Sequence, residues 1–334
     1  MNDIVELELA EARALAMAAM RGRGFADAAS RATVEALMGA ELDGLPSHGL
    51  SRLPFYLDQA ASGKVDPSAI PSLKNDGAVI RVDAGYGLAF PAVACGLEAG
   101  YETVERLGLA AVAISRSHHF GVAGAPVEAA ARRGYLALAF SNAPSAMAPW
   151  GGKRPLFGTN PIAFACPRLD DDPLLIDLSL SKVARGKVML AKKRGEPIPE
   201  GWALDTDGRP TTDPDEAIAG SMVPAGDAKG AALALMVELL TAGLTGSNFG
   251  FQASSFFDAE GEPPSIGQLI LLFDPDRFSP DFVAHAETLF TAMQDQPGVR
   301  LPGERRYRLR REGQGRVTLP SALLAALEAH AAAG

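Results

Sequence analysis

The sequence has 334 residues, of which 47 % are hydrophobic and 21 % charged, and its net charge is −9. These values describe a globular chain long enough for about two domains, and the acidic balance argues against a general nucleic-acid surface, which needs a basic stripe. No stretch approaches the roughly 20 apolar residues that cross a bilayer, and the N-terminus has neither a secretory nor a transit-peptide pattern. Cys95 and Cys166 are too few for a disulfide framework and lack the spacing of metal ligands. We therefore expect a cytoplasmic protein with no membrane or nucleic-acid partner and no metal site.

The N-terminal part of the chain predicts helices over residues 3–21 and 25–41, where Ala, Leu and Glu recur with helical spacing. A Gly-Leu-Pro turn ends this pattern, and Ser47 is placed to cap a new helix over residues 48–57. In such a helix His48 and Arg52 are four positions apart and share one face.

The His48–Arg52 pair suits the reduction of a 2-keto or 2-imino acid. A guanidinium binds a planar carboxylate through two parallel hydrogen bonds, while an imidazole exchanges a proton with the neighbouring oxygen or nitrogen. Ser47 can relay or orient that proton. The alternative is a capping serine, a hinge histidine and a solvated arginine.

The middle of the chain alternates strands with helices, which predicts an α/β core. Strands are expected over residues 78–82, 109–115, 135–141, 162–166, 174–178 and 267–273. Helices are expected over residues 88–107, 125–133, 231–244 and 280–293, with others ending near residue 193 and starting near residue 319. The helix over residues 231–244 is apolar on nearly every face, so we expect it to be buried. Residues 195–218 are rich in Pro, Gly and Asp and read as a long functional or mobile loop.

Several junctions carry residues suited to ligand binding, although the G-x-G-x-x-G dinucleotide fingerprint is absent. His118 and His119 precede two glycines between a strand and a helix, so backbone amides there can approach a ligand. Adjacent histidines point in different directions, and a strand end with one capping histidine is the alternative. Thr159 lies in a turn that is either structural or offers its hydroxyl to a carboxylate. Residues 177–179 and 229–230 precede helices and suit anion binding.

In this order the motifs resemble the type 2 malate/L-lactate dehydrogenase family, whose members reduce 2-keto or cyclic 2-imino acids with NAD or NADP. The resemblance extends over about residues 25–310 and rests on the segments 47–52, 117–121, 157–161, 177–179, 184–187, 198–203, 210–214 and 229–230. It implies a non-Rossmann α/β fold with a mixed, largely antiparallel sheet and a helical second domain, and it implies a homodimer. We expect residues 1–75 and 300–334 to form the helical substrate and dimerisation domain, and residues 76–299 the cofactor-binding α/β domain.

The resemblance also implies roles for individual residues. His48 is expected to donate the proton as an imidazolium, with Ser47 as its relay partner, while Arg52 and Thr159 bind the substrate carboxylate. Cofactor contacts are expected from His119, Phe120, Gly121, Val122, Ala123, Asp177, Leu178, Ser179, Lys229, Gly230, Pro302, Gly303, Glu304, Arg305 and Arg306.

Position 187 bears on the substrate. The imine reductases of the family have an aspartate there that completes a relay with the serine and histidine, whereas Lys187 stands here, as in many keto-acid members. Residues 176–181, 220–226 and 253–257 look most similar to sulfolactate dehydrogenases, but residues 302–307 are close to the imine reductases.

These features leave the substrate open. A second anionic group on the substrate would need a further cation, and Lys153, Arg185 and Lys187 are candidates. We therefore expect an NAD(P)-dependent oxidoreductase of small 2-hydroxy or 2-keto acids, with cyclic imino acids as the alternative substrate. A non-catalytic nucleotide sensor and a metal enzyme are further alternatives.

Overall fold

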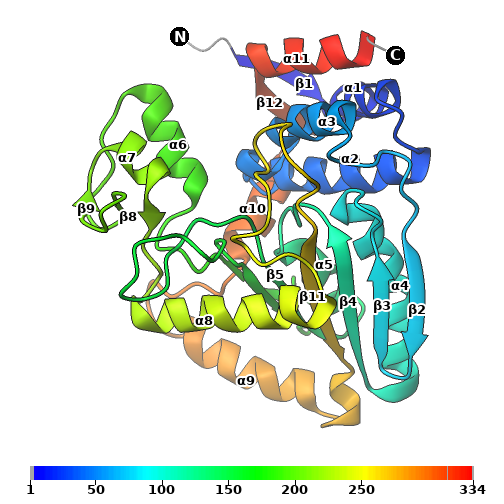
Figure 1. The fold of residues 1–334 in the computed structure, drawn as a ribbon. Coiled ribbons are helices and arrows are strands. Elements are labelled where there is room, and N and C mark those ends of the chain that lie inside the picture. Colours follow the sequence, from blue (N-terminus) through cyan, green and yellow to red (C-terminus); the bar gives the residue numbers. More distant parts are fainter. Residues whose placement is uncertain (1–3, 314, 333–334) are drawn as a thin grey trace.

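The computed structural model describes residues 4–313 and 315–332. At its centre lies a seven-stranded sheet in the order β2-β3-β4-β11-β5-β6-β7 (Figure 1). Its neighbouring strands are antiparallel except for the parallel pair β3 and β4. This mixed, largely antiparallel sheet confirms the predicted non-Rossmann α/β fold. The strands are β2 (Ser72–Asp76), β3 (Val79–Asp83), β4 (Leu109–Ser117), β5 (Leu136–Ser141), β6 (Ile162–Cys166), β7 (Leu174–Leu178) and β11 (Ile266–Phe273).

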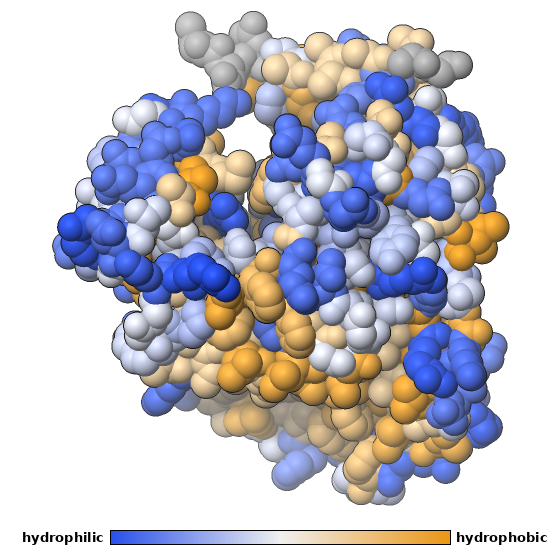
Figure 2. All heavy atoms as spheres, in the orientation of Figure 1, coloured by the Kyte–Doolittle hydropathy of each residue, from blue (hydrophilic) through white to orange (hydrophobic). Residues whose placement is uncertain are grey.

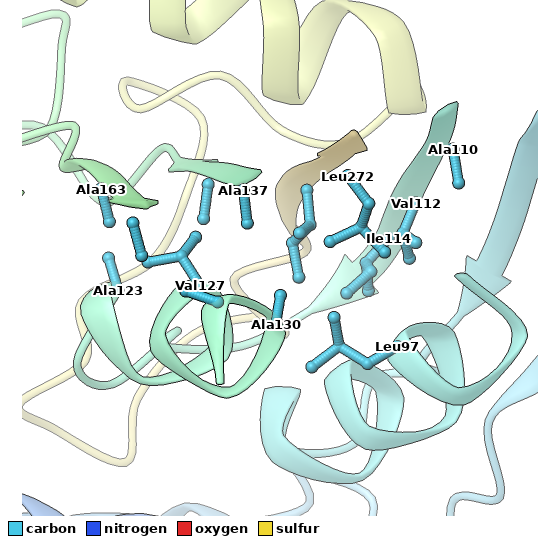
Figure 3. Packing of buried hydrophobic residues seen from close by; sticks show 14 of the residues in the cluster. Leu97, Ala110, Val112, Ile114, Ala123, Val127, Ala130, Ala137, Ala163 and Leu272 are labelled. Carbon is cyan, nitrogen blue, oxygen red and sulfur yellow. The ribbon is translucent and has the colours of Figure 1, made fainter. Parts of the chain in front are cut away.

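Both faces of the sheet are covered. Along β4, Val112 and Ile114 face α4 (Ala89–Leu107) and α5 (Gly124–Ala131) (Figure 3). The alternate residues Ala111 and Ala113 pack on the side of α8 (Ala228–Glu238). Side chains alternate between faces with a period of two, so a strand covered on both faces reads as a continuous apolar run. Helix α4 can lie close to the sheet because Gly100 has no side chain. A Cβ atom at this position would lie only 2.9 Å from the Leu272 side chain of β11.

A separate helical layer contains both ends of the described chain (Figure 1). It comprises α1 (Leu9–Gly22), α2 (Asp27–Leu42), α3 (Leu53–Ser62) and α11 (Ser321–Ala332), with the two-stranded sheet of β1 (Ile4–Glu8) and β12 (Arg316–Pro320). The prediction of helix over residues 3–21 is wrong for β1, because Ile4 to Glu8 alternate in polarity and pair with β12. The domain boundaries stay a prediction, and β2, at the end of the first predicted segment, joins the central sheet.

A small lobe follows β7 in the chain (Figure 1). Its elements are α6 (Arg185–Arg194), β8 (Ala203–Leu204), β9 (Pro210–Thr211), α7 (Pro214–Ala219) and β10 (Ser221–Met222). The prediction of a single long loop over residues 195–218 is therefore wrong. Short strands and a helix that starts at Pro214, with Asp213 as its N-cap, organise that segment.

The prediction that the apolar helix after residue 230 is buried is also wrong. Helix α8 packs on the sheet through Ala234 and Val237, but large apolar side chains on its other side and in the following π-helical turn η3 (Leu239–Gly243) are exposed. These side chains are Leu233, Leu235, Met236, Leu239 and, just after the turn, Leu244. Hydrophobic residues gather over this region of the surface (Figure 2).

Two further elements complete the C-terminal half. The short turn η4 (Pro275–Arg277) leads to α9 (Phe282–Gln294). Of the expected cofactor contacts 302–306, Pro302 and Gly303 lead into α10 (Glu304–Glu312), and the other three form its first turn. From α10, Arg310 pairs with Asp43 after α2 and with Glu128 of α5, so it ties the helical layer to the central sheet domain.

Candidate active site

The turn between α2 and α3 presents the predicted histidine and arginine. It consists of two 3-10 helices, η1 (Pro46–His48) and η2 (Leu50–Arg52), so the predicted α-helix over residues 48–57 is wrong before Leu53. Ser47 is not a helix cap either, because its Oγ lies 3.0 Å from Nδ1 of His48. The pair is thus already hydrogen-bonded in the geometry that a relay requires.

Gly49 lets this turn fold tightly against α2. The amide of Leu50 donates to Oε1 of Glu41 at 2.7 Å, and a Cβ atom on Gly49 would overlap that carboxylate. Glu41 is half-buried, and burial raises its pKa. A larger residue at position 49 would therefore displace the turn that presents His48.

Arg52 is held so that part of its guanidinium is unused. Its Nε donates to the carbonyl oxygen of Ser47 at 2.7 Å, and its guanidinium carbon lies 4.5 Å from the centre of the Phe257 ring. Its Nη1 is buried and has no hydrogen-bond partner among the described residues. Burial lowers the pKa of Arg52. A buried cation with a free donor is suited to an incoming carboxylate.

The adjacent histidines of the β4–α5 loop have different partners. His119 stacks on His48 with ring centres 5.6 Å apart, and its Nδ1 lies 2.7 Å from the hydroxyl of Tyr56. His118 is buried and bonds through Nε2 to Oε1 of Gln59 at 2.7 Å. His119 is therefore the member of the pair that contacts His48.

Burial keeps His48 neutral in the free protein. Desolvation and, next, the positive charge of Arg52 lower the pKa of His48 to about 4, while Asp177 acts in the opposite direction. The imidazolium expected to donate the proton is thus not the resting form at neutral pH, and its role in reduction stays a prediction. Neutral imidazole is the form that accepts a proton from an alcohol.

Asp177 and Arg306 join two predicted cofactor segments, and the charges of both act on the pKa of His48. Oδ2 of Asp177, at the end of β7, accepts from Nη2 of Arg306 at 2.7 Å and from the amide of Gly124 at 3.0 Å. Nη1 of Arg306 is buried and has no partner among the described residues. Gly121 has a φ of +74° and meets Phe90 so closely that no Cβ fits. An unused guanidinium donor beside a glycine turn fits an anionic dinucleotide.

Four other predicted site residues form no hydrogen bond or ion pair with His48, Arg52, His119, Asp177 or Arg306 in the described chain. Thr159 is half-buried, and its carbonyl oxygen accepts from the amide of Leu180 at 2.8 Å. Lys187 and Lys229 are exposed, at the starts of α6 and α8. The carboxylate of Glu304 accepts a hydrogen bond from the amide of Leu301 at 3.0 Å, within its own turn. Their roles stay predictions.

Sequence reasoning missed the residues that enclose the turn. Phe257 covers Arg52, and the neighbouring Phe256 ring lies 5.2 Å from the His119 ring. Nζ of Lys64, whose side chain is 1 % exposed, donates to the carbonyl oxygen of Ser255 at 2.7 Å. Gln59 donates to the carbonyl oxygen of Phe256 at 3.0 Å. The bonds from Lys64 and Gln59 join residues 191 and 197 positions apart, so no local sequence pattern indicates them.

Neither a membrane helix nor a metal centre is found in the part of the chain that the structure describes. None of its helices is both long and apolar enough to cross a bilayer. No group of three or more His, Cys, Asp or Glu side chains among residues 4–313 and 315–332 is placed to hold a metal ion.

Residues 7–328 match the model of the malate/L-lactate dehydrogenase family. Over 97 % of its length the chain is 67 % identical to a (2R)-3-sulfolactate dehydrogenase (NADP(+)) from Chromohalobacter salexigens, covering 98 % of that protein. It is 39 % identical to a Δ1-pyrroline-2-carboxylate reductase from Ancylobacter novellus, with 98 % of both chains covered. The crystal structure of a Δ1-piperideine-2-carboxylate reductase from Pseudomonas syringae superimposes with a TM-score of 0.91 at 36 % identity, over 98 % of this chain and 99 % of that one.

Proposed function

Since the chain belongs to the malate/L-lactate dehydrogenase family, we propose that it transfers hydride between NADP or NAD and C2 of a small 2-hydroxy or 2-keto acid. Within that class we propose a sulfolactate-like substrate, which the relative with 67 % identity supports. The observation that carries the chemistry is the His48–Arg52 turn, which pairs an imidazole with a buried guanidinium donor that has no partner among the described residues.

Arg52 is proposed to bind the carboxylate next to the reacting carbon. The hydrogen bond from its Nε to Ser47 and its contact with Phe257 hold the guanidinium in place, so a carboxylate meets Nη1 as an oriented donor rather than a mobile one. A second hydrogen bond from Thr159 is part of the same proposal.

His48 is proposed to move the proton at the C2 oxygen. Neutral His48 accepts it when the alcohol is oxidised, and Ser47, bonded to Nδ1, stabilises the imidazole orientation. Binding of an anionic substrate at Arg52 offsets the positive charge that lowers the pKa of His48, so the protonated form needed for reduction becomes more accessible in the complex.

The nicotinamide cofactor, when bound, supplies or accepts the hydride. Arg306 and the loop from His119 to Gly124 are proposed to hold it, because Arg306 keeps a buried donor unused and Gly121 allows close backbone approach. Asp177 orients Arg306 through their hydrogen bond at 2.7 Å.

Reduction of cyclic imino acids is the second candidate function. Two similar proteins, one by sequence and one by structure, bear names of cyclic imino acid reductases. Against this candidate, Lys187 stands where the resemblance places the relay aspartate, and it is exposed at the start of α6.

Initial rates with purified protein test the proposal. We expect NADP⁺-dependent oxidation of 3-sulfolactate, and reduction of sulfopyruvate, to exceed the rates with pyruvate and with Δ1-piperideine-2-carboxylate. Faster turnover of the cyclic imine would overturn the keto-acid assignment, and the absence of hydride transfer with every substrate would favour a non-catalytic nucleotide binder.

We also propose a cytoplasmic homodimer. The exposed apolar side chains of α8 and η3 support the dimer, because a soluble chain rarely leaves such a contiguous surface open to water. A twofold pair of copies would cover the same surface on each.

A further inference from the structure

Arg185 is a half-buried cation for which the described chain provides no carboxylate partner. Its Nη1 donates to the carbonyl oxygen of Ser145 at 3.2 Å, and burial lowers its pKa without any opposing carboxylate. Two other half-buried guanidiniums do pair with carboxylates, Arg306 with Asp177 and Arg168 with Glu287. A desolvated charge without a counter-ion is destabilising, so its presence points to an anion that arrives with a ligand.

Arg52 and Arg185 share this property. Burial lowers the pKa of each, and neither has a carboxylate partner in residues 4–313 and 315–332. Two unpaired cations match a ligand with two anionic groups, whereas a monocarboxylate would leave one of them without a partner.

The backbone beside Arg185 lies against the catalytic turn. A Cβ atom on Gly186, the next residue of α6, would lie 3.9 Å from Cβ of Ser47. The first turn of α6 therefore passes close to Ser47, the residue that bonds His48.

A cavity of about 210 Å³ lies beside the Arg185 side chain. Ser145 contributes a polar edge to this cavity, while Pro155, Val188 and Met222 give it apolar walls. The volume exceeds that of several water molecules, at roughly 30 Å³ each in the liquid. By contrast Lys153 and Lys187, the other candidate cations, are exposed to solvent.

We propose that Arg185 and this cavity form the subsite for the second anionic group, a sulfonate or a carboxylate, of a dianionic 2-keto acid whose first carboxylate is held by Arg52. The inference rests on the proposed function and names the residue that selects its substrate class. Arg185 binds the group that does not react, so it contributes to affinity and orientation rather than to proton transfer.

Steady-state kinetics of Arg185→Met test this assignment with sulfopyruvate and oxaloacetate as dianions and pyruvate as the monoanion. We expect kcat/KM for the preferred dianion to fall about 10- to 100-fold, mainly through KM, while pyruvate changes little. Comparing the two dianions tells a sulfonate subsite from a carboxylate subsite.

Arg185→Lys is expected to recover part of the dianion preference. Lys193→Met, which removes an exposed charge from the same helix, is the matched control. Equal losses with pyruvate and the dianions, or an unchanged preference, would overturn the subsite.

A binding measurement separates failure of this inference from failure of the proposed function. Calorimetric titration of the NADP⁺-loaded protein with sulfoacetate, a non-reacting dianion, requires no turnover. We expect affinity in Arg185→Met to be at least about tenfold weaker than in the wild type. If the wild type turns over no 2-keto acid, the proposed function fails, and this titration still decides the subsite. Equal affinity in both proteins, or no binding to the wild type, would refute it.

Discussion

At the scale of single residues, the charge environment of His48 sets the direction of its chemistry. Burial and Arg52 lower its pKa to about 4, and the Asp177 carboxylate only partly opposes them. The free protein at neutral pH is therefore prepared to accept a proton from an alcohol. In the reverse reaction, the substrate must bring negative charge to Arg52 before His48 is protonated readily.

This environment predicts opposite pH dependences for the two directions. Oxidation needs neutral His48, so kcat/KM for the 2-hydroxy acid should be insensitive to this group above about pH 5 and should fall about tenfold per unit below pH 4. Reduction needs the protonated form, so its kcat/KM should fall as the pH rises above about 4. Stopped assays from pH 3.5 to 8, with samples returned to pH 7 to exclude unfolding, measure both. An oxidation limb centred near the ordinary histidine value of about 6.5 would contradict the buried, neutral state.

The residues that sequence could reach are those that form local motifs. His48, Ser47 and Arg52 lie within six positions, and Asp177 and Arg306 were reached through the family resemblance. Tyr56 and Phe257 were missed because an aromatic residue on a helix or in a loop reads as core until the fold brings it to His119 or Arg52. The sequence does not distinguish Arg185 from Lys153 and Lys187 as a candidate cation. In the structure Arg185 is half-buried, whereas the two lysines are exposed.

At the level of elements, the segment carrying Phe256 and Phe257 has no regular secondary structure, yet side chains from α3 and the residues after it hold it through hydrogen bonds. Nζ of Lys64 donates to the carbonyl oxygens of Ser255 and Asp258 at 2.7 and 3.1 Å, and Gln59 donates to that of Phe256. Buried charge-assisted hydrogen bonds of this kind hold a loop without regular secondary structure.

Removing this fastening should loosen the cover over Arg52. We expect Lys64→Met to raise KM for the keto acid roughly tenfold with kcat less affected, because the Phe257 contact that orients Arg52 is lost. Hydrogen exchange of residues 253–258 should increase in parallel. Asp258→Asn is the matched control, since its side chain is half-exposed and the carbonyl acceptors remain. Unchanged exchange together with an unchanged KM would show that Lys64 does not position this segment.

The elements themselves were largely predictable, and the errors have physical causes. The expected central strands are all present, because both faces of the sheet are covered and the strands are continuous apolar runs. The local sequence predicts helix where β1 forms, because the partner strand β12 lies about 310 positions away. The 3-10 geometry of residues 46–52 depends on the bond from Leu50 to Glu41, which no propensity encodes.

At the level of the whole molecule, the exposed face of α8 and η3 differs most from what the sequence predicts. Periodicity indicated a buried helix, and the single chain leaves Leu235 48 % and Leu239 54 % exposed. A helix that is apolar on nearly every face can lie at the surface of the single chain if a second copy covers it.

A charged substitution on this face should therefore separate the copies. We expect the wild type to have the mass of two chains by light scattering, and the double variant Leu235→Glu with Leu239→Glu that of one, because four carboxylates would meet across the interface. Leu289→Glu, at a 60 % exposed position of α9, is the control. A monomeric wild type, or a double variant that still dimerises, would contradict this interface.

Single-turnover hydride transfer by His48→Ala measures whether His48 carries out the proton transfer of an NAD(P)-dependent reaction at C2. We predict a rate about 10²- to 10⁴-fold below that of the wild type, with NADPH affinity nearly unchanged. His285→Ala, which removes an exposed histidine of α9, should retain full activity. Hydride transfer at the wild-type rate in His48→Ala would contradict the claim.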